Sequence, residues 1–134
     1  MFKKKYLGII TGDVVTADEK SSAADICRLM GQHDIGVVVI MKDSLVVGIV
    51  SERDIARRVC ANNLSAENTM ADSFMTREVV SVEIKDGLNN IYKTLCEMKF
   101  RHLVIMDRNK LVGITSRRDL LDVLVGRKSK GMAL

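Results

Sequence analysis

A serine, two arginines and an aspartate stand together in Ser116-Arg117-Arg118-Asp119, directly after the apolar run at residues 111–114. A helix-like run at residues 119–125 follows, so the stretch is predicted to be the end of a buried strand that turns directly into a helix. The first turn of a helix has backbone N–H groups without partners and the positive end of the dipole, so it favours an anion. The serine adds a hydroxyl, the arginines add positive charge, and the aspartate adds a carboxylate that could accept two ribose hydroxyls.

The same arrangement occurs earlier in the chain, at an offset of 65 residues (116 − 51). Ser51, Arg53 and Asp54 there occupy the positions of the serine, the second arginine and the aspartate. The offset holds without a gap over residues 10–60 and 75–125, and the agreement concentrates at strand ends and helix starts. The sequence therefore predicts two copies of one unit, each with the same candidate site.

Each copy is predicted to be a β-α-β-β-α unit, because short β-branched runs alternate with runs of helical periodicity. In the first copy the strands are expected at residues 14–16, 37–41 and 45–50, and the helices at 22–32 and 52–61. In the second they are expected at 79–82, 102–106 and 111–115, and at 88–98 and 118–125, after a connector at 66–74 that can hold a short helical turn. Two helices cannot cover both faces of a three-stranded sheet, so the copies, residues 1–64 and 65–134, are expected to pack sheet to sheet in an α/β (α+β) fold.

Composition limits the class of protein. The chain has 134 residues, enough for one compact core, with no Pro or Trp and few aromatic residues. Its three Cys form no C-x-x-C pair, which argues against a disulfide framework and suits a reducing cytoplasm. The apolar runs are too short to span a bilayer, and the basic start is not followed by a signal-peptide core.

The net charge of +4 is concentrated at the two ends of the chain, at residues 3–5 and 127–130. These segments are predicted to be solvated tails. A nucleic-acid interface is the weaker alternative, because no aromatic residues are interleaved with the basic ones and no known nucleic-acid-binding motif is present.

The repeated unit, which ends in G-h-h-S-x-x-D (h, hydrophobic) and begins with an M/I-T-x-x-V-V lead-in, resembles the CBS domain, named after cystathionine β-synthase. The likeness covers the chain from about Thr11 to Val125. It implies a tandem pair, called a Bateman module, with two pseudo-symmetric clefts between the repeats, and it implies a homodimer. It also implies that the clefts bind AMP, ADP, ATP, NAD or S-adenosylmethionine as a regulatory ligand. No effector domain is recognisable in these residues, so the resemblance implies a stand-alone pair that signals to a separate partner protein.

The resemblance also assigns roles to individual residues. Asp54 and Asp119 would bind ribose hydroxyls, and Ser51 and Ser116 would meet phosphate oxygens. The edges of the base would be formed by Thr11, Asp13, Val14 and Val15, by Thr76, Glu78, Val79 and Val80, and by Val37 in the first copy, and the positive charge would come from Arg53, Arg101, His102, Arg117 and Arg118.

The two copies differ where Ile35-Gly36-Val37 becomes Phe100-Arg101-His102. The second copy thus has two donors suited to phosphate that the first copy lacks. Two unequal clefts are expected, and the sequence leaves open which cleft Arg101 and His102 serve.

Simpler interpretations remain beside these. Both serines are also expected as helix N-caps, and His102 as an ordinary strand histidine. Cys27, Cys60 and Cys96 are predicted to pack in or near the core. No nucleophile–base pair, metal cluster or phosphate-binding glycine loop is recognisable, so neither an enzyme nor a catalytic cofactor or metal is predicted. The alternative function is a ligand-free scaffold for dimerisation and partner binding.

Overall fold

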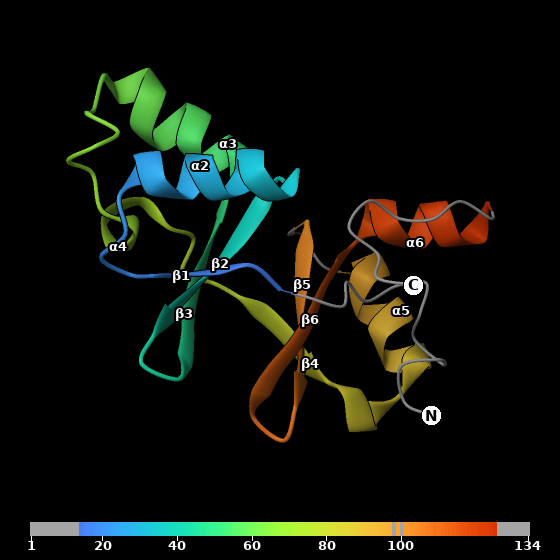
Figure 1. Cartoon of the computed structure of the whole chain (residues 1–134). Helices are drawn as coiled ribbons and strands as arrows, with labels where there is room; N and C mark the ends of the chain where they lie inside the picture. The colour runs from blue at the N-terminus through green and yellow to red at the C-terminus, as the bar shows by residue number, and fades with distance from the viewer. Residues whose placement is uncertain (1–13, 98, 100, 126–134) are drawn as a thin grey trace. The chain divides into compact units, whose positions relative to one another are not determined.

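Two three-stranded sheets, one in each half of the chain, are built from the short apolar runs of the sequence (Figure 1). The computed structural model describes residues 14–97, 99 and 101–125. The chain forms two compact units, one spanning Val15–Val79 and the other containing Val14 and the described residues from Val80 onward. Thr11, Asp13 and both basic tails lie outside the described residues.

The first sheet consists of β1 (Thr16–Asp18), β2 (Val37–Lys42) and β3 (Leu45–Ser51), in the order β1-β2-β3. β1 runs parallel to β2, and this pairing requires the crossover that α2 (Ala23–His33) provides. Ser22 caps α2, and its hydroxyl accepts the Asp25 N–H at 3.1 Å. β2 and β3 form an antiparallel hairpin.

The core of the first unit lies between this sheet and its helices. Ile26 of α2 and Val38, Ile40 and Val50 of the sheet are fully buried in one cluster. Val39, which alternates with them on β2, is also fully buried. Both faces of β2 are therefore covered, as the continuous apolar pattern predicts.

The helical run after β3 changes its period as it proceeds. It begins with α3 (Glu52–Asp54), continues as a π-helix, η1 (Ile55–Val59), and ends as a 3₁₀ turn, η2 (Cys60–Asn62). Asn63 then adopts a left-handed conformation with φ of 53° and terminates the run. A single helix was the expectation for this stretch, and a π-turn inside a helical run is uncommon outside functional sites.

The connector between the repeats packs on the first unit. It contains α4 (Ala71–Phe74), whose Ala71 and Phe74 side chains belong to the first core cluster. After α4, Thr76 forms an antiparallel bridge with Ile49 of β3, with N–H···O distances of 2.9 and 3.0 Å. Lys20 forms an ion pair with Asp72 at 2.6 Å on the surface of this segment.

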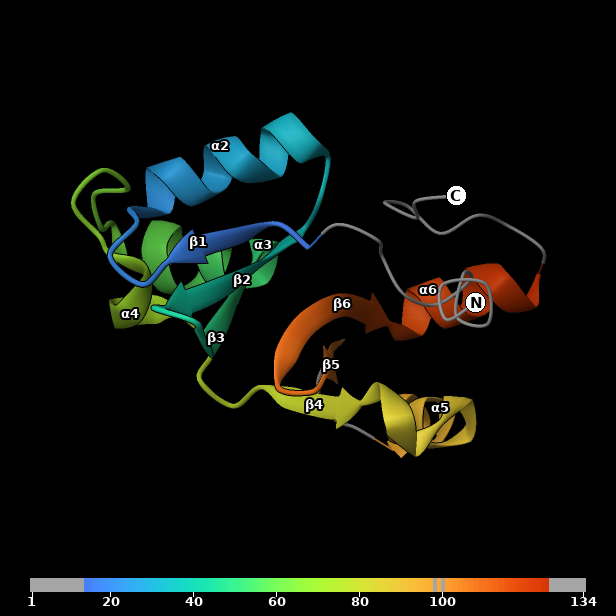
Figure 2. The same ribbon diagram turned by 60° about the horizontal axis from the view of Figure 1, so that its bottom comes forward.

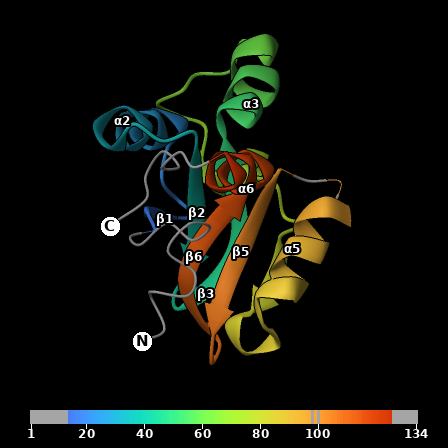
Figure 3. The same cartoon turned by 90° about the vertical axis from the view of Figure 1, so that its right-hand side faces the viewer.

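The second unit repeats the first. It contains β4 (Val80–Glu83), η3 (Ile84–Asp86), α5 (Leu88–Glu97), β5 (His102–Asp107), β6 (Lys110–Ser116) and α6 (Arg117–Leu124). Its sheet has the order β4-β5-β6 and the same parallel and antiparallel pairings, and its bulge at Ile105/Met106 matches the bulge at Ile40/Met41. Figure 2 shows α5 beyond the end of β4, and Figure 3 shows α5 alongside β5, where Ile91, Leu95 and Leu103 share a fully buried cluster. The mixed α and β architecture and the duplicated β-α-β-β-α order are thus confirmed.

The prediction that the cysteines pack in or near the core is wrong. Cys27, Cys60 and Cys96 lie in helical elements, but all three are exposed. Cys27 follows Ile26, whose side chain takes the inward position on α2, so the thiol lies on the flank of the helix. Partial burial, with a smaller contribution from the Cys60 thiol, raises the pKa of the Cys27 thiol. A raised pKa reduces the thiolate fraction and hence the nucleophilicity of Cys27.

Replacing Thr115 by valine is expected to stabilise the protein. Thr115 is 1% exposed, and its Oγ1 has no hydrogen-bond partner among the residues that the structure describes. The equivalent residue of the first repeat is Val50, which is fully buried. Since an unsatisfied buried hydroxyl costs about 1–3 kcal/mol, T115V should raise the free energy of unfolding in urea by about 1 kcal/mol. The reverse change, V50T, should lower it, and equal signs for the two variants would contradict the explanation.

Replacing Gly48 by alanine should destabilise the first unit. A Cβ at Gly48 would lie 2.6 Å from the Met75 sulfur and 2.9 Å from the Thr76 carbonyl oxygen. The backbone of Thr76 cannot move without losing its bridge to Ile49, so G48A should cost about 1–3 kcal/mol in urea unfolding. The control is G31A, because a Cβ at Gly31 on α2 meets nothing within 4 Å and should stabilise by about 0.5–1 kcal/mol.

The Lys20–Asp72 ion pair should give a defined pH dependence. The hydrogen bond from the Lys20 ammonium lowers the pKa of the Asp72 carboxyl. A lowered pKa in the folded state contributes stability above the ordinary aspartate value of about 3.9, and this contribution is lost as the pH falls further. D72N should therefore be slightly less stable than the parent at pH 7, and the difference should vanish by about pH 2. Urea unfolding of D72N, K20M and the double variant measures the effect, which must be non-additive if the pair is its source.

Candidate functional site

Each repeat places a serine and an aspartate at the junction between its last strand and the following helix. In the first repeat Ser51 ends β3, and its N–H and hydroxyl donate to Oδ2 of Asp54 at 2.9 and 3.1 Å. The Asp54 N–H donates back to the Ser51 hydroxyl at 3.2 Å. These reciprocal bonds form a capping box, which satisfies the backbone groups that a helix start leaves without partners. We call this pair the first box.

The second repeat contains the same structure, which we call the second box. Ser116 ends β6, and its N–H and hydroxyl donate to Oδ2 of Asp119 at 2.9 and 3.0 Å. The Asp119 N–H donates to the Ser116 hydroxyl at 3.2 Å. Both serines thus have the capping role that was the simpler interpretation, and each box holds its carboxylate in a fixed orientation.

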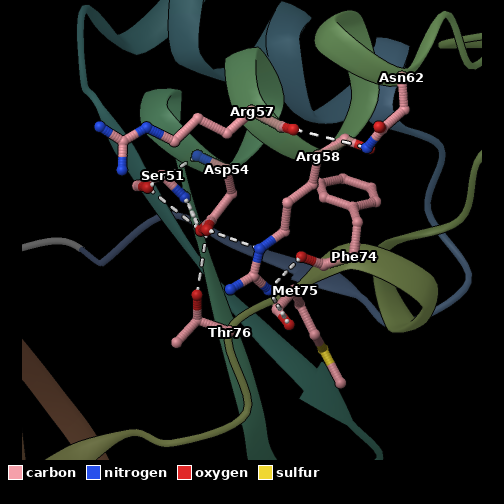
Figure 4. A network of polar contacts seen from close by, with 8 residues as sticks. All are labelled: Ser51, Asp54, Arg57, Arg58, Asn62, Phe74, Met75 and Thr76. Atoms are coloured by element: carbon pink, nitrogen blue, oxygen red, sulfur yellow. Dashed lines mark hydrogen bonds and ion pairs between the residues drawn. The ribbon is translucent and has the colours of Figure 1, made fainter.

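The other oxygen of the aspartate distinguishes the two boxes. In the first, Oδ1 of Asp54 accepts the Thr76 hydroxyl at 3.1 Å and lies 3.7 Å from Nε of Arg58, so that Asp54 is only 8% exposed (Figure 4). In the second, Asp119 is half-buried, and its Oδ1 accepts no hydrogen bond from any residue in the described part of the chain. The described residues therefore leave Oδ1 of Asp119 open, and Thr11, which is equivalent to Thr76 in the repeat, lies outside them.

The arginine next to Asp54 was not predicted from the sequence. Besides its contact with Asp54, Arg58 donates through one nitrogen to the backbone oxygens of Phe74 and Met75, at 3.0 and 3.2 Å (Figure 4). A signal for it was present, because aspartate and arginine four residues apart lie on one face of a helical turn. The second repeat has Val123 at this position, so it has no equivalent of Arg58.

The two repeats differ in sequence at the start of the strand that pairs with the serine of each box. Val37 pairs with Ser51 in the register of β2 and β3, and His102 pairs with Ser116 in that of β5 and β6. Arg101, which is exposed, directly precedes His102. Arg101 and His102 thus lie in the same unit as Ser116 and Asp119, beside the second box.

The remaining predicted site residues lie in several places. Thr76 contacts Asp54, as described, whereas Val14 belongs to the second unit and Val15 pairs with β2 through its carbonyl oxygen. Nε of Arg117 donates to the Leu95 oxygen at 2.8 Å and so caps the end of α5. Arg53, Glu78 and Arg118 are exposed, and Val79 and Val80 are half-buried.

The charge at the helix start also differs between the repeats. In the first, the Glu52 N–H donates to the Gly36 oxygen at 2.9 Å, and its carboxylate carbon would lie 3.3 Å from a Cβ at Gly36. The second repeat has arginine at both equivalent positions, Arg101 and Arg117. The start of the helix is therefore flanked by an acidic residue in the first repeat and by two basic residues in the second.

Two other kinds of site are absent from the described residues. No group of three or more His, Cys, Asp or Glu side chains there could hold a metal ion. No described helix has the length and apolarity needed to cross a membrane.

Comparison with known proteins identifies the repeated unit. The CBS domain family matches residues 7–61 and 71–126, which together cover most of the chain. The CBS domain-containing protein YhcV of Bacillus subtilis is 28% identical over 125 residues, which are 93% of this chain and 89% of that protein. The uncharacterized protein MK0525 of Methanopyrus kandleri is 33% identical over 83% of this chain, but the match spans only 58% of MK0525.

A solved structure shows the same fold. A protein with CBS domains from Burkholderia ambifaria MC40-6 superimposes with a TM-score of 0.77 at 28% identity, covering 89% of this chain and 88% of that one. Each of the two family matches contains one of the two boxes, so the comparison and the structure identify the same repeated unit. The chain therefore belongs to the CBS domain family and carries two CBS domains in tandem.

Proposed function

We propose that the chain is a regulatory module that binds an adenosine-containing nucleotide and passes its occupancy to a separate partner protein. Membership of the CBS domain family supports a regulatory role. The similar Burkholderia protein is described, provisionally, as a signal-transduction protein. The ligands we propose are AMP, ADP and ATP first, and NAD and S-adenosylmethionine second. As a regulatory module, the protein carries out no chemical step on the ligand.

The observation that carries this proposal is the carboxylate of Asp119. Its Oδ2 is held by Ser116, while Oδ1 accepts nothing from the described residues. A carboxylate fixed in this way is preorganised, because it loses little side-chain entropy when a ligand binds. The two neighbouring hydroxyls of a ribose are donors of suitable spacing, and hydrogen bonds to an ionised acceptor are stronger than neutral ones.

The groups around the second box suit the phosphate of such a ligand. The first turn of α6 provides backbone amides at the positive end of the helix dipole, while the hydroxyl of Ser116 donates to Asp119. Arg118 is exposed in that turn, and Arg101 and His102 lie at the start of the neighbouring strand. A nucleoside phosphate combines the diol and the anion that these two sets of groups favour.

We further propose that occupancy is read through the geometry of a homodimer. Leu121 and Val125, four residues apart on and just after α6, are 60% and 67% exposed, and a second copy of the chain would remove them from water. A ligand changes the dimer only if it binds two geometries with different affinity. A ligand-free scaffold is the second candidate function, and the closed carboxylate of Asp54 favours it for the first repeat.

Calorimetric titration tests the proposal. The intact protein should bind at least one of AMP, ADP, ATP, NAD and S-adenosylmethionine. Replacing Asp119 by alanine should weaken binding by about 10- to 100-fold, because a hydrogen bond to a charged group contributes about 1.5–3 kcal/mol. The matched control is Asp122→Ala on the same helix, which removes the same charge from another half-buried aspartate and should leave the affinity unchanged.

Circular dichroism must show that both variants remain folded. If none of the five compounds gives heat or a thermal shift with the parent protein, the nucleotide-sensor proposal fails and the scaffold is favoured. If D122A loses as much affinity as D119A, net charge and not the second box determines binding.

A further inference from the structure

The carboxylate of Asp54 in the first box has no unused oxygen. Oδ2 accepts the two bonds from Ser51, and Oδ1 accepts the Thr76 hydroxyl and pairs with Arg58. The residue is 8% exposed, although it stands at the start of a helical run. A ribose hydroxyl at this carboxylate would compete with the Thr76 hydroxyl and the Arg58 guanidinium for the space and charge of Oδ1.

These contacts join the carboxylate to the connector between the repeats. Thr76 directly follows the connector, and Arg58 donates to the carbonyl oxygens of Phe74 and Met75 immediately before it (Figure 4). The same segment is bonded to β3 through the Thr76–Ile49 bridge. Asp54 and Arg58 therefore hold residues 74–76, at and just after the end of α4, against the first repeat.

The second box lacks the arginine that closes the first. The sequence has valine at 123, where the first repeat has Arg58, so no cation stands four residues after the aspartate. Asp119 is half-buried, and its Oδ1 accepts no bond from the described residues, which do not include Thr11, the equivalent of Thr76. The second repeat also has Arg101 and Arg117 where the first has Gly36 and Glu52, so the sequence around the second box is more positively charged.

We infer that Arg58 makes the first box a structural latch, so that of the two boxes only the second binds the nucleotide. This inference rests on the proposed function and adds to it a stoichiometry of one nucleotide per chain. Arg58 is then a specificity-determining residue, which acts by occupying the acceptor that a second ligand would need. The family resemblance alone treats the two boxes alike, and the difference comes from the contacts of this chain.

The ligand part is tested by titrating the intact protein with AMP and with ATP. The parent should bind one equivalent per chain. Asp119→Asn should lose at least about tenfold in affinity, whereas Asp54→Asn, with the same change of charge and shape, should stay within about threefold of the parent. Two equivalents per chain in the parent, or an equal loss in both variants, overturns the inference while leaving the proposed function intact.

The latch part is tested without any ligand, by amide hydrogen exchange measured by NMR. Arg58→Val gives the first repeat the residue of the second, and it should accelerate exchange of the Thr76 amide, which donates to Ile49, by about tenfold or more. Arg57→Val is the control, because it removes the same charge from an exposed side chain that points away from Asp54 (Figure 4). Its Thr76 amide should exchange within about twofold of the parent rate.

The titrations and the exchange measurements distinguish failure of the proposed function from failure of the latch. If the parent protein binds neither AMP nor ATP, the proposed function fails for these ligands, and the exchange measurements still decide whether Arg58 closes the first box. If R58V and R57V exchange alike, Arg58 is not a latch and the inference is overturned, whatever the titrations give.

Discussion

A carboxylate held over the start of a helix is the interaction on which both repeats depend. The last strand of each repeat runs into a helix without a loop, and the first amides of that helix have no partners within it. Serine and aspartate satisfy these groups reciprocally in both repeats. Since this task needs only Oδ2 of the aspartate, Oδ1 is left for other uses. Under the proposed function, the partner of Oδ1 determines whether a box is structural or can bind a ligand.

The duplication explains how the two boxes can differ without harm to the fold. Strand order, hairpin register and bulge position are the same in both units, because they follow from apolar residues that the repeats share. The differences at the boxes are few: Gly36 against Arg101, Glu52 against Arg117, and Arg58 against Val123. Arg58, Arg101 and Arg117 are exposed, so the charges exchanged lie outside the core. A repeat can therefore change its electrostatics and keep its packing.

The sequence predicts the strands and most helices to within about two residues, because period and apolar runs are set locally. It does not predict the π-turn at Ile55–Val59, since such a turn depends on the tertiary contacts of the residues around it. The contact between Arg58 and the carbonyl oxygens of Phe74 and Met75 was missed for a related reason. Every residue has a backbone carbonyl oxygen, so the residue types do not show which one accepts a given hydrogen bond. The cysteines were misplaced because helical periodicity alone does not say which side of a narrow apolar stripe is inward.

Under the proposed function, stability and ligand binding compete for the same oxygen of the aspartate in each repeat. A ligand at Asp54 would compete with a hydroxyl bond and an arginine contact at Oδ1, and displacing Arg58 would leave the carbonyl oxygens that it contacts less well satisfied. Each displaced bond to a charged group costs about 1.5–3 kcal/mol, so the loss of one such bond reduces affinity by at least about tenfold. At Asp119 the described residues offer no such competition, because its Oδ1 accepts no bond from them. Under the proposed function, the repeat that lacks this arginine contact is the one that binds the ligand.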